Sequence, residues 1–337
     1  MSFRLIVGHS RLVSLVSRAV ARETLPPALL LAGPAGIGKR RLALAVARAI
    51  NCLAPRTSEV LERDACGECT ACRRIARGVH PDVIVLAPGD TGSIKIEQVR
   101  DVVERAGYRP FEGRRRVVVI DEADALVHAA QNALLKTLEE PPSASIFILV
   151  SSMPDTLLAT VRSRCPRLRF AALQPGEVAE VLVRDHGYAD ADARAAAADA
   201  DGSVGRALSA ASADVGVARE QAQRLLEQTA RTTDPSRRLE LAKDLGGQKG
   251  ATAVDRDQMK VCVRVLATLL HDLGVMAAGA DARTLANADC EPWLGRLSAS
   301  FDHDRSLRAY AAADRALGAL ERNASPKIVA DWLVLQL

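Results

Sequence analysis

The stretch from Leu29 to Arg41, LLLAGPAGIGKRR, limits the fold of this chain more than any other segment. Gly33, Gly38 and Lys39 satisfy the pattern G-x-x-x-x-G-K after a short apolar run and before a helix-compatible segment, the context that a phosphate-cradling loop needs. The next residue is normally Ser or Thr, whose hydroxyl helps to hold Mg²⁺. Here it is Arg40. The stretch therefore predicts a nucleotide-type domain that has lost its own hydrolysis, and it leaves nucleotide binding open.

Strand and helix patterns alternate through the first half of the chain. Short apolar or β-branched runs predict strands at 28–32, 82–86, 116–120 and 146–150. Helical spacing of apolar residues predicts helices at 11–22, 40–50, 94–107 and 129–140. This alternation indicates an α/β domain with a parallel sheet. From Gln174 onward the strand patterns stop, so the rest of the chain is expected to be helical.

A second motif strengthens the loop assignment. The segment 117–124, VVVIDEAD, is a β-branched strand that ends in an acidic pair. In P-loop proteins the first acid holds Mg²⁺ and the second orients the attacking water. The alternative is a buried strand that happens to end in solvated acids. The candidate nucleotide site comprises Gly33, Gly36, Gly38, Lys39, Asp121 and Glu122, with Arg40 in place of the Ser or Thr.

Four of the seven cysteines lie close together in the chain: Cys52, Cys66, Cys69 and Cys72. Two overlapping C-x-x-C turns bring three thiolates within reach of one ion, and Cys52 can supply the fourth. Four sulfur ligands suit a structural, tetrahedral Zn²⁺ site without an open position. Iron–sulfur ligation and free thiols are the alternatives. An odd number of cysteines argues against a disulfide framework and for a reducing compartment.

Bulk composition adds weaker constraints. The net charge of +4 permits contact with nucleic acid without arguing for it, and 3% aromatic residues leave few rings for base stacking. Charged residues interrupt the apolar character of the N-terminus, and no apolar run reaches the roughly 18 residues of a spanning helix. We expect a soluble, cytoplasmic protein without a membrane partner.

Two arginine features have competing interpretations. Arg164, in the triplet Ser-Arg-Cys, is on general grounds a solvated residue or the partner of an acid. It could instead stabilise charge on a neighbouring subunit's γ-phosphate. Arg109, Arg114, Arg115 and Arg116 could meet phosphates of DNA, although such a run is more often a solvated loop.

Together these motifs resemble the delta-prime family of bacterial DNA polymerase III clamp-loader subunits, a branch of the AAA+ group. The resemblance rests on GPAGIGKR at 33–40, the four-cysteine insert, VVVIDEADALVHAAQNALLKTLEEPP at 117–142, LLATVRSRC at 157–165 and NASPKIVADWLVLQL at 323–337. These segments span most of the chain. A lone P-loop would not be specific.

The resemblance implies three domains: an AAA+ P-loop domain at 1–171 with a zinc-binding insert at 52–72, a small helical lid at 172–212, and a helical collar for oligomerisation at 213–337. It implies that Arg164 is an arginine finger acting in trans, and that Ser151 or Ser152 occupies the sensor position. Gly205 stands where motor subunits carry a sensor arginine. It also implies partners: other subunits of a hetero-oligomeric ring, the sliding clamp and primed DNA.

The leading interpretation is a clamp-loader subunit without ATPase activity of its own, a part of the DNA-directed DNA polymerase holoenzyme. The rival is an autonomous AAA+ ATPase, either a motor-type loader subunit or a remodelling enzyme. Mg²⁺-dependent hydrolysis by the isolated chain would favour the rival.

Overall fold

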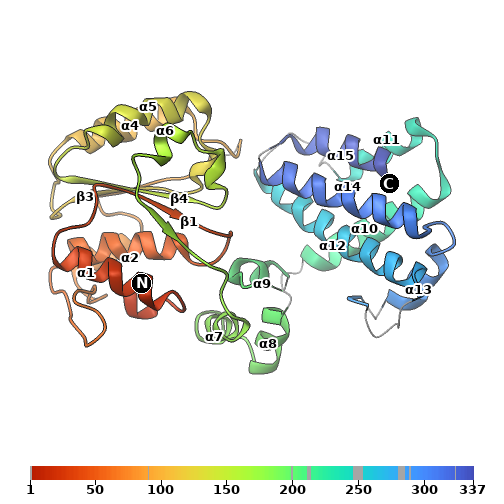
Figure 1. The fold of residues 1–337 in the computed structure, drawn as a ribbon, viewed down its shortest axis with the longest axis horizontal. Helices are drawn as coiled ribbons and strands as arrows, with labels where there is room; N and C mark the ends of the chain where they lie inside the picture. The colour runs from red at the N-terminus through yellow and green to blue at the C-terminus, as the bar shows by residue number, and fades with distance from the viewer. Residues whose placement is uncertain are drawn as a thin grey trace. The chain divides into compact units, whose positions relative to one another are not determined.

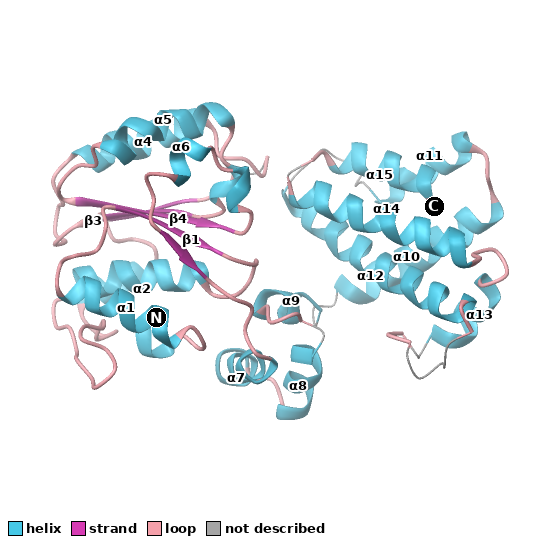
Figure 2. Cartoon of the chain, viewed as in Figure 1, coloured by secondary structure: helices cyan, strands magenta, loops and turns pink. Residues whose placement is uncertain are grey.

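The chain divides into two compact units. The computed structural model describes residues 2–89, 91–198, 200–210, 214–245, 253–279, 285–287, 290–322 and 324–337. The first unit comprises Met1–Gly89 and Ser93–Ala210, and the second comprises Asp90–Gly92 and Ala211–Leu337. Figure 1 shows the sheet in the first unit, and Figure 2 shows that the second is built from helices.

A parallel five-stranded sheet organises the first unit. Its strands are β1 (Ala28–Ala32), β2 (Val83–Leu86), β3 (Arg116–Ile120), β4 (Ser145–Ser151) and β5 (Arg167–Arg169). They lie in the order β2-β3-β4-β1-β5, with every pairing parallel. Because β3, β4 and β1 are neighbours, the loops at their carboxyl ends meet at one edge of the sheet, where open α/β sheets bind ligands.

Helices cover both faces of this sheet. In Figure 1, α1 (Ser10–Ala21) and α2 (Lys39–Asn51) lie on one face, and α4 (Ile96–Gly107), α5 (His128–Glu139) and α6 (Ala159–Arg162) lie on the other. Each face of the sheet packs against its helices in a separate apolar cluster, and alternate residues of β3 contribute to the two clusters. Val117 and Val119 pack with α1 and α2, whereas Val118 and Ile120 pack with α4 and α5. Strands buried on both faces in this way read as continuous apolar runs.

The sequence predictions of an α/β fold and of four strands and four helices in this unit are confirmed, with ends that differ by up to two residues. Three strands or helices were not predicted. β5 has only three residues, two of them arginines, α3 (Thr70–Ala76) lies inside the cysteine insert, and α6 has only four residues. Short 3₁₀ turns occur at Phe3–Leu5, Ala123–Ala125 and Pro154–Thr156.

Three short helices complete the first unit: α7 (Pro175–His186), α8 (Asp190–Ala198) and α9 (Val204–Ala210). They enclose a small apolar cluster of their own that includes Val178, Leu182 and Ala193. The boundary at 171/172 stays a prediction, because this segment belongs to the same compact unit as the sheet.

The second unit is a helical bundle in its described residues. Its helices are α10 (Asp214–Arg231), α11 (Pro235–Leu245), α12 (Ala253–Ala277), α13 (Glu291–Leu297), α14 (His303–Glu321) and α15 (Pro326–Gln336). A single apolar cluster links α10, α12, α14 and α15. Pro326 occupies the first turn of α15 after Ser325, as expected for a helix start, although the Ser325 side chain makes no capping bond. Among the described residues, none of the helices is both long and apolar enough to span a membrane.

Candidate functional site

The P-loop connects β1 to α2 at the carboxyl edge of the sheet. Gly36 and Gly38 adopt φ values of +74° and +98°, which a residue with a side chain rarely adopts. Gly33 is constrained by close packing, because a Cβ there would lie 2.4 Å from the carbonyl oxygen of Phe170. The loop therefore has the backbone of a phosphate cradle that ends on the amino end of a helix.

Lys39, however, is directed at the loop itself. Its Nζ donates hydrogen bonds to the carbonyl oxygens of Gly33, at 2.7 Å, and Pro34, at 2.5 Å. The side chain is buried, and burial lowers the pKa of Lys39 to about 8 in spite of the nearby carboxylates. The ammonium group thus has partners before any phosphate arrives.

Arg40 is placed against the first acid of the β3 motif. Its Nη1 lies 3.2 Å from Oδ2 of Asp121, which is nearly buried. Burial raises the pKa of Asp121, and the Arg40 charge opposes this effect. Asp121 is the carboxylate expected to hold Mg²⁺. The guanidinium thus pairs with the predicted metal-binding carboxylate, from the position where a second metal ligand would normally stand.

The second acid and the sensor position follow at the ends of β3 and β4. Glu122 has φ of +49°, a left-handed conformation for a residue with a side chain. Ser152 donates to the carboxylate of Asp124, from its backbone N at 2.9 Å and its Oγ at 3.2 Å. Ser151 lies buried within β4, and its Oγ has no hydrogen-bond partner. Of the two serines, Ser152 is the one fixed by the acidic motif.

The start of α9 packs directly onto the P-loop. The backbone N of Gly205 donates to the carbonyl oxygen of Gly36 at 3.2 Å, and Oγ of Ser203 donates to that of Ala35 at 2.9 Å. A Cβ on Gly205 would lie 3.0 Å from the Cα of Gly36. A larger residue at 205 would therefore require the P-loop backbone to shift by a few tenths of an ångström. The sequence identifies Gly205 only as the position where motor subunits carry a sensor arginine. The structure shows that it also lets α9 contact the backbone of Gly36.

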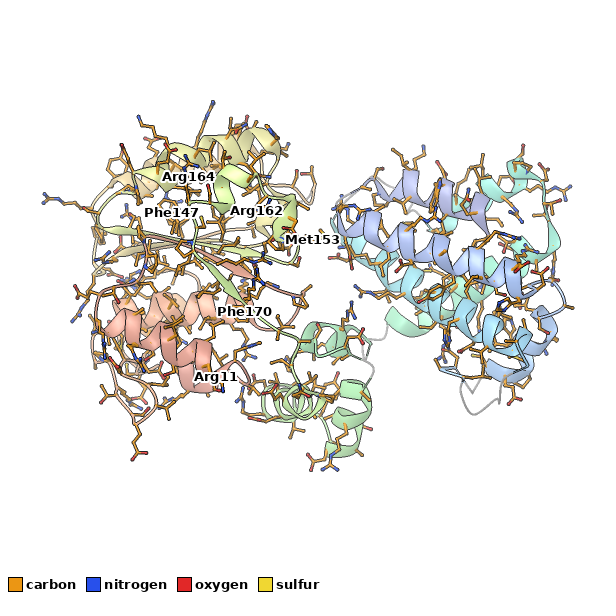
Figure 3. All side chains as sticks on the ribbon, in the orientation of Figure 1. Arg11, Phe147, Met153, Arg162, Arg164 and Phe170 are labelled. Carbon is orange, nitrogen blue, oxygen red and sulfur yellow. The ribbon has the colours of Figure 1, made fainter. Side chains whose placement is uncertain are left out.

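Arg164 follows α6 on the opposite face of the sheet from α2, and Figure 3 labels it with Arg162. Its Nη1 donates to the carbonyl oxygen of Thr160 at 2.8 Å, and its Nη2 forms an ion pair with Glu139 at the end of α5. The side chain remains about 30% exposed. Arg162 pairs separately with Asp155 at 2.5 Å. Arg164 lies outside the P-loop site of its own chain.

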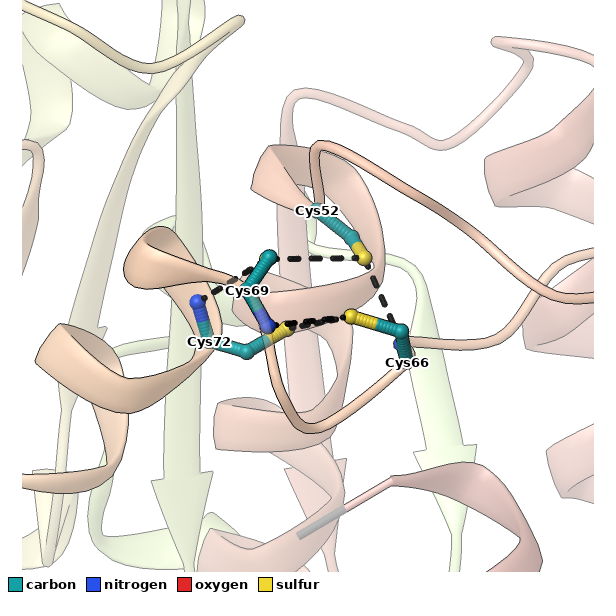
Figure 4. Close-up of side chains that lie close together, drawn as sticks. All are labelled: Cys52, Cys66, Cys69 and Cys72. Atoms are coloured by element: carbon teal, nitrogen blue, oxygen red, sulfur yellow. Dashed lines mark hydrogen bonds between the residues drawn. The ribbon is translucent and has the colours of Figure 1, made fainter.

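The four cysteines of the insert come together (Figure 4). Their Sγ atoms all lie within 4.8 Å of one another, and two of the pairs are 3.9 and 4.0 Å apart. Four sulfurs at about 2.3 Å from one Zn²⁺ would be separated by roughly 3.8 Å along each tetrahedral edge. A disulfide would require about 2.05 Å. The cluster therefore has the dimensions of a tetrahedral metal site and not those of a bonded pair.

Backbone amides support the same interpretation. The N–H groups of Glu68 and Cys69 both point at Sγ of Cys66, at 3.4 and 3.3 Å, and that of Cys72 points at Sγ of Cys69 at 3.4 Å. Although burial acts to raise it, the pKa of Cys69 falls to about 6, because the backbone N–H groups of Cys72 and Leu53 and the neighbouring thiols stabilise its thiolate. Such donors stabilise thiolates, the form that binds metal. These four residues can hold a metal ion.

The arginine run 109–116 does not form one surface. Arg116 is buried and pairs with Asp82 at 2.9 Å, and it also donates to the carbonyl oxygens of Tyr108 and Arg109. Asp82 in turn accepts the backbone N–H groups of residues 111–113 at 2.7 to 2.9 Å. This buried ion pair orders the loop, and it removes Arg116 from the set available to DNA.

Comparisons with known proteins agree with the motifs. Residues 8–174, about half of the chain, match the family described as DNA polymerase III, delta subunit. The DNA polymerase III subunit delta' of Pseudomonas aeruginosa is 43% identical over 155 residues, which are 46% of this chain and 45% of that protein. The DNA polymerase III subunit gamma of a Buchnera aphidicola strain is 33% identical over 180 residues, 53% of this chain and 48% of that one. The chain thus spans about half the length of the curated relatives it matches.

Among solved structures, a DNA polymerase III gamma subunit-related protein from Thermotoga maritima aligns with a TM-score of 0.38 at 15% identity, covering 92% of this chain and 99% of that one.

Proposed function

We propose that this chain, which through residues 8–174 belongs to the clamp-loader group of AAA+ proteins, acts as a delta-prime-type subunit of a DNA polymerase III clamp loader. In this role it is one member of a cytoplasmic, hetero-oligomeric ring that places a sliding clamp on primed DNA. Residues 1–171, 172–212 and 213–337 serve as its AAA+, lid and collar domains.

The subunit does not hydrolyse ATP by itself, and one contact supports this most directly. The ion pair between Arg40 and Asp121 sets a guanidinium against the carboxylate that would otherwise hold Mg²⁺. A metal ion would have to displace that guanidinium, and it would still lack the hydroxyl ligand. The carbonyl bonds of Lys39 act in the same direction, because its ammonium group must leave them to reach a phosphate.

Arg164 acts in trans. Its guanidinium lies away from its own P-loop, partly exposed, and Glu139 and the carbonyl of Thr160 orient it. Presented to the γ-phosphate of an adjacent motor subunit, it stabilises the charge that develops in the transition state, an effect of roughly 10³ to 10⁵ in rate in other systems. Glu139 is a positioning residue in this arrangement.

The four cysteines hold a structural zinc ion. No fifth position is needed, because the four sulfurs complete a tetrahedron. The insert has few apolar residues of its own, so metal binding supplies much of its stability, on the order of 10 kcal/mol in small zinc peptides.

The test uses the clamp-loader ring reconstituted with the partner subunits of the same organism. Arg164→Ala should sharply lower the ATPase rate stimulated by clamp and primed DNA, while assembly is retained. Arg162→Ala is the matched control, because Arg162 lies two residues away and pairs with Asp155 of the same chain. An unchanged rate in the Arg164 variant would exclude the trans role. Equal losses of ATPase rate in both variants would show that the conformation of the turn around residues 162–164 is required, and not the Arg164 guanidinium itself.

A further inference from the structure

A cationic cavity lies at the amino-terminal edge of the sheet, the edge opposite the P-loop. It is a half-open hollow of about 530 Å³, lined by the end of α1 and the turn after it, the end of α2, a turn of the cysteine insert and the residues at the starts of β3 and β4. Small-molecule sites commonly measure 300 to 1,000 Å³. No role in the proposed function uses this cavity.

Three arginines line it: Arg63, Arg114 and Arg115. Glu23 is the one acid among the lining residues, so positive charge is in excess. The three arginines come from two segments that are distant in sequence. Arg63 is fixed to the end of α2, where its Nε donates to the carbonyl oxygen of Ala49 at 2.9 Å.

These guanidinium groups have unused donors. Nη2 of Arg63 is buried and has no hydrogen-bond partner. Exposed Arg114 forms neither a hydrogen bond nor an ion pair within the described part of the chain. Arg115 reaches only the carbonyl oxygen of Ser143 through Nη1, at 3.5 Å. Unpaired donors held close together are what a bound oxyanion would satisfy.

Electrostatic repulsion within the cavity is consistent with this interpretation. Burial, followed by the charge of Arg114, lowers the pKa of Arg63, and Cys52 and Glu23 oppose this only in part. An anion between the arginines would relieve the repulsion. Planar guanidinium groups bind phosphate oxygens in a bidentate manner, and a doubly charged phosphate monoester suits several arginines better than a singly charged carboxylate.

Most of the remaining lining residues are apolar, whereas Glu23 and Ser143 are polar. Val20, Leu25, Ile50 and Ile146 contribute to the cavity wall, and Val20, Ile50 and Ile146 are themselves buried. These residues expose little of this apolar surface to the cavity, so it adds a weak preference for an anion that carries an apolar group. An aromatic or aliphatic body attached to the anion would cover it.

We propose that Arg63, Arg114 and Arg115 form a binding site for a small phosphate monoester with an apolar body. The loop that carries two of these arginines is held rigid by the Asp82–Arg116 ion pair, and the backbone N of Arg115 is bonded to Oδ1 of Asn51 at 3.1 Å. The backbone that carries these arginines is therefore ordered before the ligand binds, and the site is separate from the P-loop.

Calorimetry of the full chain with phenyl phosphate tests the proposal, with Lys39→Ala as the background to remove the P-loop as a competing phosphate site. We expect binding to persist in Lys39→Ala, and Arg114→Gln or Arg115→Gln to weaken it about tenfold, the effect of one charge-assisted hydrogen bond. Arg109→Gln is the matched control, since Arg109 is exposed on the same loop and does not line the cavity. Inorganic phosphate should bind more weakly than phenyl phosphate.

Three results would overturn the proposal. Loss of binding in Lys39→Ala, with none in Arg114→Gln, would assign the phosphate to the P-loop. An equal loss in Arg109→Gln would reduce the effect to general surface charge. Benzoate binding as tightly as phenyl phosphate would show that the site does not select phosphate. Because Arg114 is exposed and unpartnered, its variant should keep the wild-type unfolding temperature, so that weakened binding reflects the site.

Discussion

The buried ion pair between Asp82 and Arg116 gives the sharpest prediction of stability. Asp82 is fully buried and Arg116 nearly so, with 2.9 Å between Oδ1 and Nη2. Asp82→Asn would leave the guanidinium buried without its counter-charge and would present an amide N–H₂ to backbone donors. Breaking a buried pair by removing one partner costs about 3–5 kcal/mol. For a unit of this size, that loss lowers the unfolding temperature by roughly 6–20 °C.

The effect should also depend on pH. Although burial acts to raise it, the pKa of Asp82 falls to about 2, because the N–H groups of 111–113 and the guanidinium of Arg116 stabilise the carboxylate. A carboxylate with a depressed pKa in the folded state stabilises the fold above the unfolded-state value of about 4, and this contribution is lost as pH falls toward the folded-state value. The difference in free energy of unfolding between wild type and Asp82→Asn should therefore be constant near neutral pH and should decrease below about pH 4.

Calorimetric unfolding provides the assay, and the chain contains an internal control. Its two tryptophans, Trp293 and Trp332, both lie in the second unit, so tryptophan fluorescence should report an unchanged transition there. Asp101→Asn is the matched variant, because Asp101 pairs with Arg105 at the surface and such pairs contribute about 0.5 kcal/mol or less. A loss in Asp82→Asn as small as that in Asp101→Asn, or a difference that persists unchanged to pH 3, would refute the reasoning.

Three further predictions concern the metal and nucleotide sites. Cys66→Ser should reduce bound zinc far below one ion per chain by metal analysis and lower the unfolding temperature of the first unit; retention of a full equivalent would remove Cys66 from the ligand set. Gly36→Ala should destabilise the first unit more than Gly38→Ala. A Cβ at 36 would lie 2.4 Å from Oγ of Ser203, whereas a Cβ at 38 would have nothing within 4 Å. Equal decreases in unfolding temperature would contradict the packing of α9 on the P-loop. Arg40→Thr should increase Mg²⁺-dependent binding of an ATP analogue by calorimetry, because it restores a hydroxyl ligand, and an unchanged affinity would show that this residue is not what limits binding.

Much of the fold follows from local patterns. Runs such as RVVVI at 116–120 are apolar on both faces because helices cover both sides of the sheet, and the predicted strand matches β3. β5 was missed because its three residues read as Arg-Leu-Arg, and it exists only through parallel pairing with β1. Pairing between segments so distant in sequence has no local pattern to reveal it.

The candidate site was predictable in its parts but not in its contacts. The spacing of Cys66, Cys69 and Cys72 was sufficient to bring three thiols together, because overlapping C-x-x-C turns are local. The pairing of Arg40 with Asp121 and the packing of Gly205 on Gly36 join segments about 80 and 170 residues apart. Nothing in the local sequence specifies such contacts; the sheet order and the placement of α9 do.

The charges of the 109–116 run illustrate the same limit. Sequence alone treats its arginines as equivalent, whereas the fold buries Arg116 against Asp82, directs Arg114 and Arg115 to a cavity and leaves Arg109 exposed. The difference arises from Asp82, which lies about 30 residues earlier and precedes β2.

ATP turnover by the isolated chain tests the central claim most directly. The account predicts that the purified protein, supplied with ATP and Mg²⁺ in a single-turnover assay, forms no ADP above the level of Lys39→Ala. The reason is that Arg40 forms an ion pair with Asp121, the predicted Mg²⁺ ligand, and that the residue after Lys39 has no hydroxyl group to bind the metal. Mg²⁺-dependent hydrolysis by the chain alone, abolished by Lys39→Ala, would contradict it and would identify the protein as an ATPase in its own right.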